Sequence, residues 1–512
     1  MTKQHTNSFL SVIVTLLLAG SSYLRAQEDD SQIYELSPFT IEPEEGWIAT
    51  ETLAGTRLRT DFKDVAAQVE IFTMEFMDDY GITSMEESLI YSLNVANSDD
   101  RVSGNGEGFG RNPNSFQQIR GIGGGTQSRN FFEAYTPTEN YNLSRLTIAS
   151  GPQSILFGTG SPSGVLDVTL NRAMLSEDFG SITFQADTNG GHRVSLDYNK
   201  VIFEDKFALR IALVDKNTKQ EWDPNHDKME GYYGTFTWKP FENTIIMGHY
   251  EHQKRDWNRA NRFLPFDNVS PWFGWGQPTF DNSDVSWGDL PIIYDRGSNR
   301  ATILMNPDGS WEQPTTTFRN MAQVDRPVDM PGVSPVNFEA DNWTLLDNSI
   351  FPRAMDVNIR GNTETQTMEA DLSNIFIEQK LADNWYVELG YNKEDNDGVI
   401  YDTGLADRTI WVDPNKFLGD GKTPNPHLGE FYMEGTPQWA PRGNYRENFR
   451  GTMSYELNFE DKFDSILKWF GRHRMAALRS RDDRLTGLAQ QGLRYRFLPD
   501  PNTLEEPYFA NA

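Results

Sequence analysis

The chain has 512 residues and a formal net charge of −28, with 46 basic and 74 acidic side chains. A negative field of this size repels phosphate groups, which argues against a nucleic-acid partner. The sequence contains no cysteine, which excludes disulfides, thiolate catalysis and cysteine-ligated metals.

The first residues have the pattern of an export signal. Lys3 precedes an apolar run at residues 9–20, and small residues lead to a cleavage position after Ala26. The apolar run is too short to cross a bilayer as a helix. We therefore predict a signal peptide at residues 1–26 and secretion of the remainder.

Residues 27–50 are predicted to be a mobile leader, because they are rich in acidic residues, Ser and Pro and poor in core-forming side chains. Inside the leader lies a short patch with alternating apolar residues. Its backbone could add as a strand to the sheet edge of a partner, or it could dock on its own domain. The patch consists of Leu36, Ser37, Pro38, Phe39, Thr40 and Ile41.

The next segment alternates and then changes its period. Val69 and Ile71 lie in a predicted strand, and residues 76–94 carry apolar residues at mixed helical spacing, which predicts one or two short helices. Residues 142–173 read as a strand, a break at Gly151 and Pro152, a glycine-rich loop and a second strand. A nucleotide-binding loop is disfavoured, because no Lys-Ser or Lys-Thr pair follows the last glycine.

In residue identity and order these segments resemble the plug domain of TonB-dependent outer-membrane receptors. The usual form of that plug is "FxIRG" followed by "RVEVLRGPQSALYGSGSPGGVINVVTKRP". The resemblance implies a plug over residues 51–175, a TonB box at residues 36–41 and a structural role for the arginine of the first motif. The residues that carry it are Arg120, Gly121, Arg145, Gly151, Pro152, Gln153, Gly158, Gly160 and Gly164.

The chain departs from that pattern at several positions. Thr147 and Ser150 stand where the family has an acidic and a basic residue, and Asp167 replaces an asparagine. Leu170 and Asn171 stand where Thr-Lys is common. The electrostatic contact between plug and barrel is therefore expected to be altered.

From Gly180 onward the chain alternates with a period of two residues. Ile182 and Phe184 begin the pattern, and residues 189–191 give a hairpin signal. Further strands are expected at residues 194–198, 207–213, 231–238, 244–251, 365–377, 385–393, 446–459 and 466–479.

The connections between these strands come in two sizes. Short acidic turns flanked by aromatics, at residues 203–206, 240–243, 381–384 and 459–462, contrast with long polar stretches such as residues 216–230 and 254–360. Short turns at one end and long loops at the other are typical of outer-membrane barrels, although a soluble sandwich would also alternate. We predict a mostly β fold, in which an N-terminal α+β plug lies inside an antiparallel transmembrane β-barrel at residues 180–512.

No catalytic group of residues is apparent. His249 and His252 are three apart and point to opposite faces of a strand, so they make a poor metal pair. Residues 223–227 and 395–398 have some features of calcium loops but lack the downstream glutamate, and loop tips are expected there. We predict no enzyme activity, no bound metal and no cofactor.

The resemblance implies active import of a scarce, bulky solute across the outer membrane, with the TonB C-terminal domain and membrane lipid as partners. Siderophore, vitamin and glycan importers share the scaffold. About nine or ten strands are expected, against about 22 for a plugged barrel, and we therefore expect the sequence to be an amino-terminal portion. The alternatives are a secreted or surface β-rich binding or adhesion protein without energy coupling, and a passive porin.

Overall fold

We describe the chain from a computed structural model. The described residues are 38–39, 46–54, 58–65, 67–97, 117–122, 124–151, 161–219, 225–258, 365–382, 384–402, 438–459 and 471–489, with short pieces at 266–267, 273, 276–277, 279, 349, 409–412, 416, 424, 426, 428–432, 469 and 491–492. The predicted signal peptide lies outside them. So do Leu36, Ser37, Thr40, Ile41, Pro152, Gln153, Gly158 and Gly160. The described residues, from Pro38 onward, belong to one compact unit.

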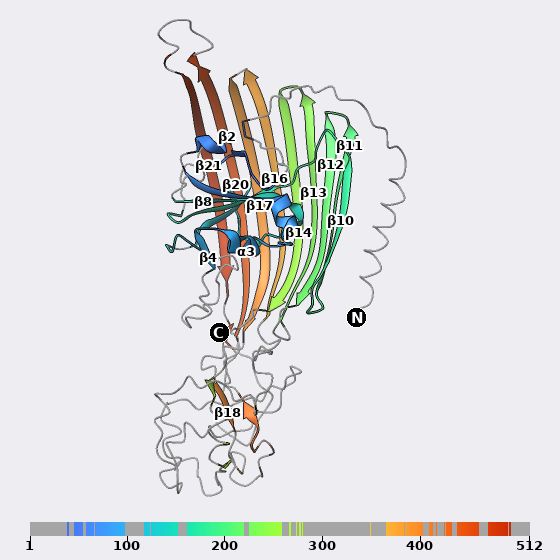
Figure 1. Cartoon of the computed structure of the whole chain (residues 1–512), viewed down its shortest axis with the longest axis vertical. Helices are drawn as coiled ribbons and strands as arrows, with labels where there is room; N and C mark the ends of the chain where they lie inside the picture. The colour runs from blue at the N-terminus through green and yellow to red at the C-terminus, as the bar shows by residue number, and fades with distance from the viewer. Residues whose placement is uncertain are drawn as a thin grey trace. The chain divides into compact units, whose positions relative to one another are not determined.

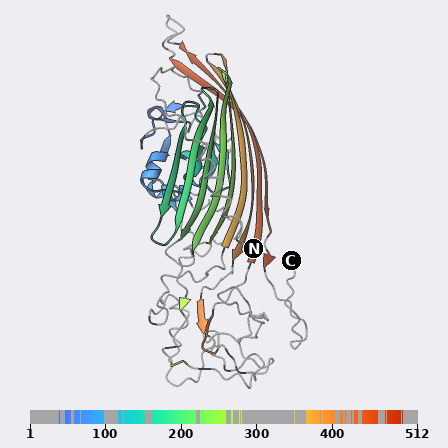
Figure 2. The same cartoon turned by 90° about the vertical axis from the view of Figure 1, so that its right-hand side faces the viewer.

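A large antiparallel sheet, here called the wall, dominates the described part of the chain (Figure 1). Its strands follow in the order β10-β11-β12-β13-β14-β16-β17-β20-β21, and β22 also pairs with β20. Figure 2 shows the wall as a curved sheet. The strand bounds are β10 Phe179–Ala186, β11 His192–Phe203, β12 Phe207–Lys219, β13 His226–Phe241, β14 Thr244–Asn258, β16 Thr365–Ala382, β17 Trp385–Asp402, β20 Gln438–Asn458, β21 Arg472–Leu488 and β22 Gln491–Gly492.

The two faces of the wall differ in chemistry. Along β16 the residues at even positions from Gln366 to Glu378 are buried, while Ile375 and Ile377 are exposed. The outward face of the wall presents a series of large apolar side chains, as the alternation predicts. These include Ile182, Phe184, Leu209, Tyr232, Trp238, Tyr250, Leu389, Tyr391, Phe449 and Met453.

In the described part of the chain, three small sheets lie outside the wall and outside the five-stranded sheet that is described next. Strands β1 Glu51–Thr52 and β2 Thr60–Asp61 pair with each other, as do β4 Val95–Asn97 and β5 Gln117–Ile119. The third pairing joins β15 Phe266–Asp267, β18 Thr409–Val412 and β19 Phe431–Tyr432.

The second main sheet has the order β3-β8-β9-β6-β7, with β6 and β9 parallel. Its strands are β3 Gln68–Thr73, β6 Thr126–Arg129, β7 Phe132–Glu133, β8 Leu143–Ser150 and β9 Gly164–Leu170. We call the described residues between 46 and 170 the plug. The predicted strand at Val69 and Ile71 and the two strands that flank the glycine-rich loop are confirmed.

The predicted helices of residues 76–94 are present and short. They are α2 Met74–Asp79, α3 Met85–Ser88 and the 3₁₀ turn η2 Leu89–Tyr91; two more turns are η1 Phe62–Asp64 and η3 Asn140–Asn142. Ser84 and Glu87 form a reciprocal capping box that starts α3. Such short helices depend on packing for their stability.

One apolar core joins the plug to the wall. Met77, Leu89 and Leu146 of the plug share it with Val214 of β12 and Met229 of β13. The plug is therefore attached to the inward face of the wall by packed side chains. Among the described residues, no helix is both long and apolar enough to cross a membrane.

Two sequence expectations about loops were wrong. Residues 395–398 lie within β17, with Asp395 opposite Asp371 and Tyr445, because the strand continues well past the predicted boundary. The stretch 216–230 is not one long loop, since β12 runs to Lys219 and β13 begins at His226. Asp227, expected at a loop tip, lies in β13 and bonds Arg255 at 2.7 Å. These strands continue through polar residues because each such residue is paired with a residue on the adjacent strand.

Candidate functional site

The plug meets the wall mainly through one segment, residues 129–141, here called the anchor segment. It begins at a turn where Asn130 and Phe131 have φ of +47° and +59°. Asp167 of β9 supports this turn, because its carboxylate accepts a hydrogen bond from the backbone N–H of Phe131 at 2.7 Å and another from the Ser128 hydroxyl. Asp167, which replaces the expected asparagine, thus supports this turn inside the plug.

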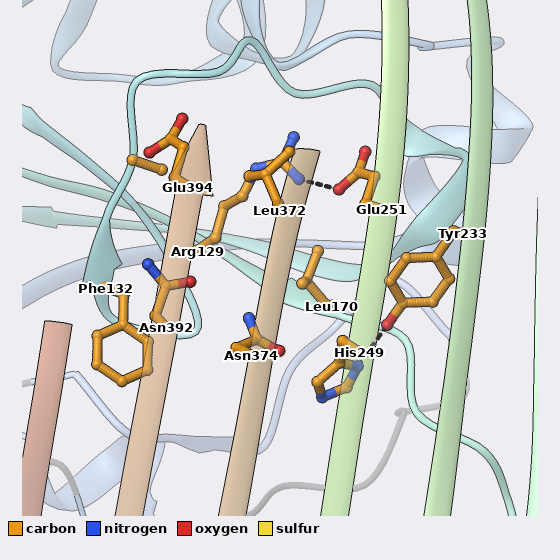
Figure 3. Close-up of a pocket in the computed structure, with 11 residues that line it drawn as sticks. Arg129, Phe132, Leu170, Tyr233, His249, Glu251, Leu372, Asn374, Asn392 and Glu394 are labelled. Atoms are coloured by element: carbon orange, nitrogen blue, oxygen red, sulfur yellow. Dashed lines mark hydrogen bonds and ion pairs between the residues drawn. The ribbon is translucent and has the colours of Figure 1, made fainter. Parts of the chain in front are cut away.

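Arg129 and Glu251 form the central ion pair between the anchor segment and the wall (Figure 3). Both side chains are buried, at 3% and 2% exposed. The Tyr141 hydroxyl donates to the other oxygen of Glu251 at 3.0 Å. Burial and the neighbouring Glu251 carboxylate raise the pKa of Tyr141 well above its usual range. Tyr141 therefore stays a hydrogen-bond donor at neutral pH.

Glu394 of β17 accepts from three donors of the anchor segment. They are the backbone N–H of Tyr135 at 3.0 Å, the backbone N–H of Thr136 at 2.6 Å and the Thr136 hydroxyl at 2.5 Å. Asn396 on the same strand donates to the Thr136 hydroxyl oxygen at 3.0 Å. A buried carboxylate with this many donors fixes the backbone of the segment.

Three inward arginines of β20 contact the other side of the anchor segment. Arg446 bonds Glu133 at 2.7 Å, and Arg442 donates to the Tyr135 hydroxyl at 3.1 Å. Arg450 donates to the Phe131 carbonyl at 3.2 Å, bonds Glu388 at 3.1 Å and lies 4.1 Å from the centre of the Phe132 ring. The spacing of four residues places all three on one face of the strand.

Near the other edge of the wall, the buried Arg193 of β11 makes two bonds to Glu139. Its Nε lies 2.7 Å from Oε1 and its Nη2 lies 3.0 Å from Oε2, and Nη2 also donates to Asn140 at 2.7 Å. The anchor segment is thus held by β11, β14, β17 and β20 through buried charges. These contacts resist displacement of the plug relative to the wall.

The residues that follow β9, 171–177, form a connector from plug to wall. Wall side chains donate to successive carbonyls of this connector. Arg210 donates to Arg172, Thr237 to Ala173, and Asn199 to both Met174 and Glu177, at 3.2, 2.7, 3.0 and 2.6 Å. The Tyr233 hydroxyl donates to Asn171 and lies 2.6 Å from His249 Nδ1 (Figure 3).

The residues that carry the family motifs lie apart from the anchor segment. Arg120 has a φ of +55° and its backbone N–H donates to Asn94 at 2.8 Å; a Cβ atom at Gly151 would lie 3.5 Å from its guanidinium. Gly121 also has a positive φ, of 68°. The structure therefore brings together Arg120 and Gly151. Their roles stay a prediction.

Two further motif residues lie in the paired strands β8 and β9: Arg145 is in β8, and Gly164 begins β9 opposite Ser150. Arg145 is buried and donates to the Glu51 carbonyl at 3.0 Å. Gly164 has a φ of +144°, and a Cβ atom there would lie 2.4 Å from the Ala149 carbonyl oxygen. Only glycine fits where β9 approaches β8 this closely.

Of the predicted TonB-box segment, Pro38 and Phe39 are described. The Pro38 carbonyl accepts from the Arg59 backbone N–H at 2.6 Å, and Phe39 is only 7% exposed. Phe39 lines a cavity of about 80 Å³ between the plug and the wall. The segment's function as a partner-binding strand is not tested by this geometry.

Within the described part of the chain, no group of three or more potential ligands could hold a metal ion. His249 is buried facing the plug, whereas His252 lies on the outer face beside Asp371 at 3.1 Å. They point to opposite faces, as the strand period predicts.

The sequence reasoning missed the anchor segment and its partners. A signal did exist in β20, where Arg442, Arg446 and Arg450 recur every four residues, although the predicted strand 446–459 contained only the last two. Buried charges on the inward face of a sheet require partners, so this recurrence indicates an enclosed polar surface. The partners of these arginines in the anchor segment lie 307 to 320 residues away in the sequence.

No protein-family model matches the chain. Among curated proteins, it is similar to the ferrioxamine receptor of Yersinia enterocolitica, with 24% identity over 218 residues that cover 40% of this chain and 29% of the relative. It is also similar to the ferrichrome outer membrane transporter/phage receptor of Escherichia coli K12, with 23% identity over 260 residues, 47% of this chain and 34% of the relative. The chain thus spans about a third of the length of the curated relatives it matches.

Among solved structures, the pyoverdine receptor FpvA of Pseudomonas aeruginosa PAO1 superimposes with a TM-score of 0.57 at 11% identity, covering 94% of this chain and 57% of that one. The ferric preacinetobactin receptor BauA of Acinetobacter baumannii gives 0.53 at 10% identity, covering 92% and 56%. The likeness confirms the predicted fold of a plug with barrel strands. The relatives are named as receptors and a transporter, which agrees with the predicted outer-membrane location.

Proposed function

Taking the chain as part of a TonB-dependent receptor of the outer membrane, as its fold and its relatives indicate, we propose that it serves the uptake of an iron-loaded siderophore. The observation that carries this proposal is the plug, which is attached by buried ion pairs to the inward face of a sheet whose outward face is apolar. An apolar outer face suits lipid. A plug that is held by buried ion pairs suits a pore that must stay closed until energy is supplied to open it.

The names of the relatives support the proposed cargo class. The two curated ones are named for ferrioxamine and ferrichrome, and FpvA was solved with pyoverdine bound. These ligands differ, so the specific siderophore of this chain is a matter for measurement. We expect the solute to bind at the long-loop end of the wall.

Energy coupling is proposed to act through the leader. The patch Leu36, Ser37, Pro38, Phe39, Thr40 and Ile41 would pair as a strand with the TonB C-terminal domain, which then pulls on the plug. The patch already contains one proline, Pro38, and its other residues keep the backbone N–H groups that such a pairing uses. A second proline in the patch would remove one such donor.

The test measures iron uptake from ferrioxamine, ferrichrome and pyoverdine by iron-starved cells that produce this protein, with and without TonB. We expect uptake of at least one of them, only when TonB is present. Leu36→Pro should abolish uptake and leave siderophore binding intact, while Ser31→Pro in the same leader should alter neither.

Two outcomes would contradict the proposal. The first is the absence of binding to every ferric siderophore tested. The second is binding that never leads to TonB-dependent uptake, which would favour a surface ligand-binding protein without energy coupling.

A further inference from the structure

Four aromatic rings gather on the surface of the plug. They belong to Trp47, Phe76, Tyr80 and Tyr91, which lie ahead of β1, in α2, directly after α2 and in η2, and we call them the aromatic patch. The Phe76 and Tyr80 rings lie 4.8 Å apart with an angle of 34° between them. Trp47 and Tyr91 stand at 90° and 88° to Phe76, each at 5.5 Å. Phe76 is thus flanked by two rings that stand upright to its own.

Hydrogen bonds fix the aromatic patch in place. The Trp47 indole N–H donates to Asp79 at 2.9 Å, and the Gly46 backbone N–H donates to Glu75 at 2.5 Å. The Thr73 hydroxyl donates to the Gly46 carbonyl at 2.8 Å. The rings are therefore held in one arrangement before a partner arrives, which lowers the entropic cost of binding.

The same rings remain open to solvent. Trp47, Tyr80 and Tyr91 are 48%, 48% and 46% exposed, and Ile90 and Leu93, near Tyr91 in the sequence, are exposed still further. Local packing of the short helices accounts for the buried part of each ring, but it leaves the exposed part without a role. A fixed and exposed apolar surface of this kind marks an interaction site.

The charge around the aromatic patch is negative. Residues 68–97 contain no lysine and no arginine. In the described part of the chain, Glu70, Glu75 and Asp79 accept hydrogen bonds from uncharged donors, which are a hydroxyl, a side-chain amide, a backbone N–H and the Trp47 indole. A partner with positive charge would therefore be complementary to these carboxylates.

The chemistry of the aromatic patch selects among possible occupants. A cation is attracted to the face of an aromatic ring, and the planar guanidinium group of arginine can stack there while its N–H groups bond carboxylates. An anionic membrane surface would be repelled. A free small cation would need a concave site, whereas these rings are open and the carboxylates extend from Glu70 to Asp79. A chain segment that carries several cations matches this extent.

We propose that the aromatic patch is a docking surface for an arginine-bearing segment of another protein. Its guanidinium groups stack on the exposed rings and bond the carboxylates beside them. The inference goes beyond the proposed function, because it depends neither on the cargo nor on strand pairing by the leader.

The test uses the purified full chain in detergent and two fluorescently labelled peptides, one of alternating arginine and glycine and one of alternating lysine and glycine. Fluorescence anisotropy measures both affinities, and we expect the arginine peptide to bind more tightly. Tyr80→Leu should weaken its binding about fivefold, because the π face is lost, whereas Tyr80→Phe should preserve it. Tyr91→Leu and Tyr91→Phe repeat the comparison at a second ring, so the result does not depend on the folding of one variant.

A pair of double variants tests the charge. Glu75→Gln with Asp79→Asn removes two charges but keeps an acceptor oxygen on both side chains, and it should weaken binding of the arginine peptide about threefold. The matched control is Glu204→Gln with Asp205→Asn, which removes two charges from an exposed turn and should leave the affinity unchanged.

Three outcomes would overturn the docking surface. Equal affinities of the leucine and phenylalanine variants at both rings would show that the aromatic faces take no part. Equal weakening by the two double variants would reduce the binding to general attraction by an acidic protein. Self-association of the chain that Tyr80→Leu abolishes, without binding of either peptide, would assign the aromatic patch to a second copy instead.

Discussion

Arg193 of the wall and Glu139 of the plug form a two-bond ion pair that is almost fully enclosed. Their side chains are 6% and 4% exposed. An enclosed pair contributes little net stability compared with apolar residues, but removal of one partner leaves a buried charge without compensation. The pair therefore makes the attachment of plug to wall specific to one arrangement.

The first prediction follows from this asymmetry. Arg193→Ala should lower the free energy of unfolding by about 3–5 kcal/mol, because Glu139 is left buried without its partner. Removal of both charges in Arg193→Met with Glu139→Leu should cost clearly less. Thermal unfolding of the purified chain in detergent checks both.

Lys63→Ala is the matched control, since Lys63 pairs with Asp61 at 2.8 Å on the surface. Solvent screens such a pair, and no measurable change is expected. A double variant that is less stable than Arg193→Ala would show that the enclosed pair is a net source of stability.

The second prediction concerns pH. Burial raises the pKa of Tyr141 in the folded chain, whereas the unfolded chain has the ordinary value of about 10. Above that pH the unfolded state releases a proton that the folded state keeps, so the stability contributed by Tyr141 is present below pH ~10 and is lost as pH rises.

Stability measured between pH 8 and pH 11 should therefore fall less steeply in Tyr141→Phe than in the unsubstituted chain. Tyr80→Phe is the control, because Tyr80 is 48% exposed. Equal slopes for Tyr141→Phe and the unsubstituted chain would show that Tyr141 does not stay protonated.

The third prediction concerns the connector. Asn199 is fully buried, donates to the Met174 and Glu177 carbonyls, and accepts from the Met174 N–H at 2.9 Å. Asn199→Ala leaves these groups without their partner and should cost about 1–3 kcal/mol.

Limited proteolysis locates that effect. Cleavage within residues 171–177 should become faster in Asn199→Ala, and Glu204→Ala in an exposed turn should not change it. Faster cleavage elsewhere, with the connector still protected, would mean that Asn199 supports the wall alone.

The fourth prediction uses two glycines. Gly164→Ala should prevent normal pairing of β8 with β9, because its backbone is left-handed and the added Cβ would lie 2.4 Å from the Ala149 oxygen. Gly234→Ala in β13 should be tolerated, since nothing lies within 4 Å of its Cβ position. The yield of folded protein in the membrane fraction compares the two, and equal yields would refute the close approach.

Local sequence patterns were enough to predict the kinds of element and their order. The period-two alternation from Ile182 onward and the short acidic turns predict the wall, because an antiparallel sheet with one apolar face leaves that signature locally. Gly151 and Pro152 predict the break after β8, because these residues interrupt a strand locally. The inward arginines of β20 were visible as a pattern.

The residues that hold the plug to the wall are set by contacts between distant parts of the folded chain. Glu251 and Glu394 belong to strands more than 100 residues from Arg129 and Thr136, and no local period indicates such pairs. Strand ends such as those of β17 were likewise set by neighbours across the sheet. The burial of Phe39 depends on surfaces contributed by plug and wall together, and these surfaces exist only once the chain has folded.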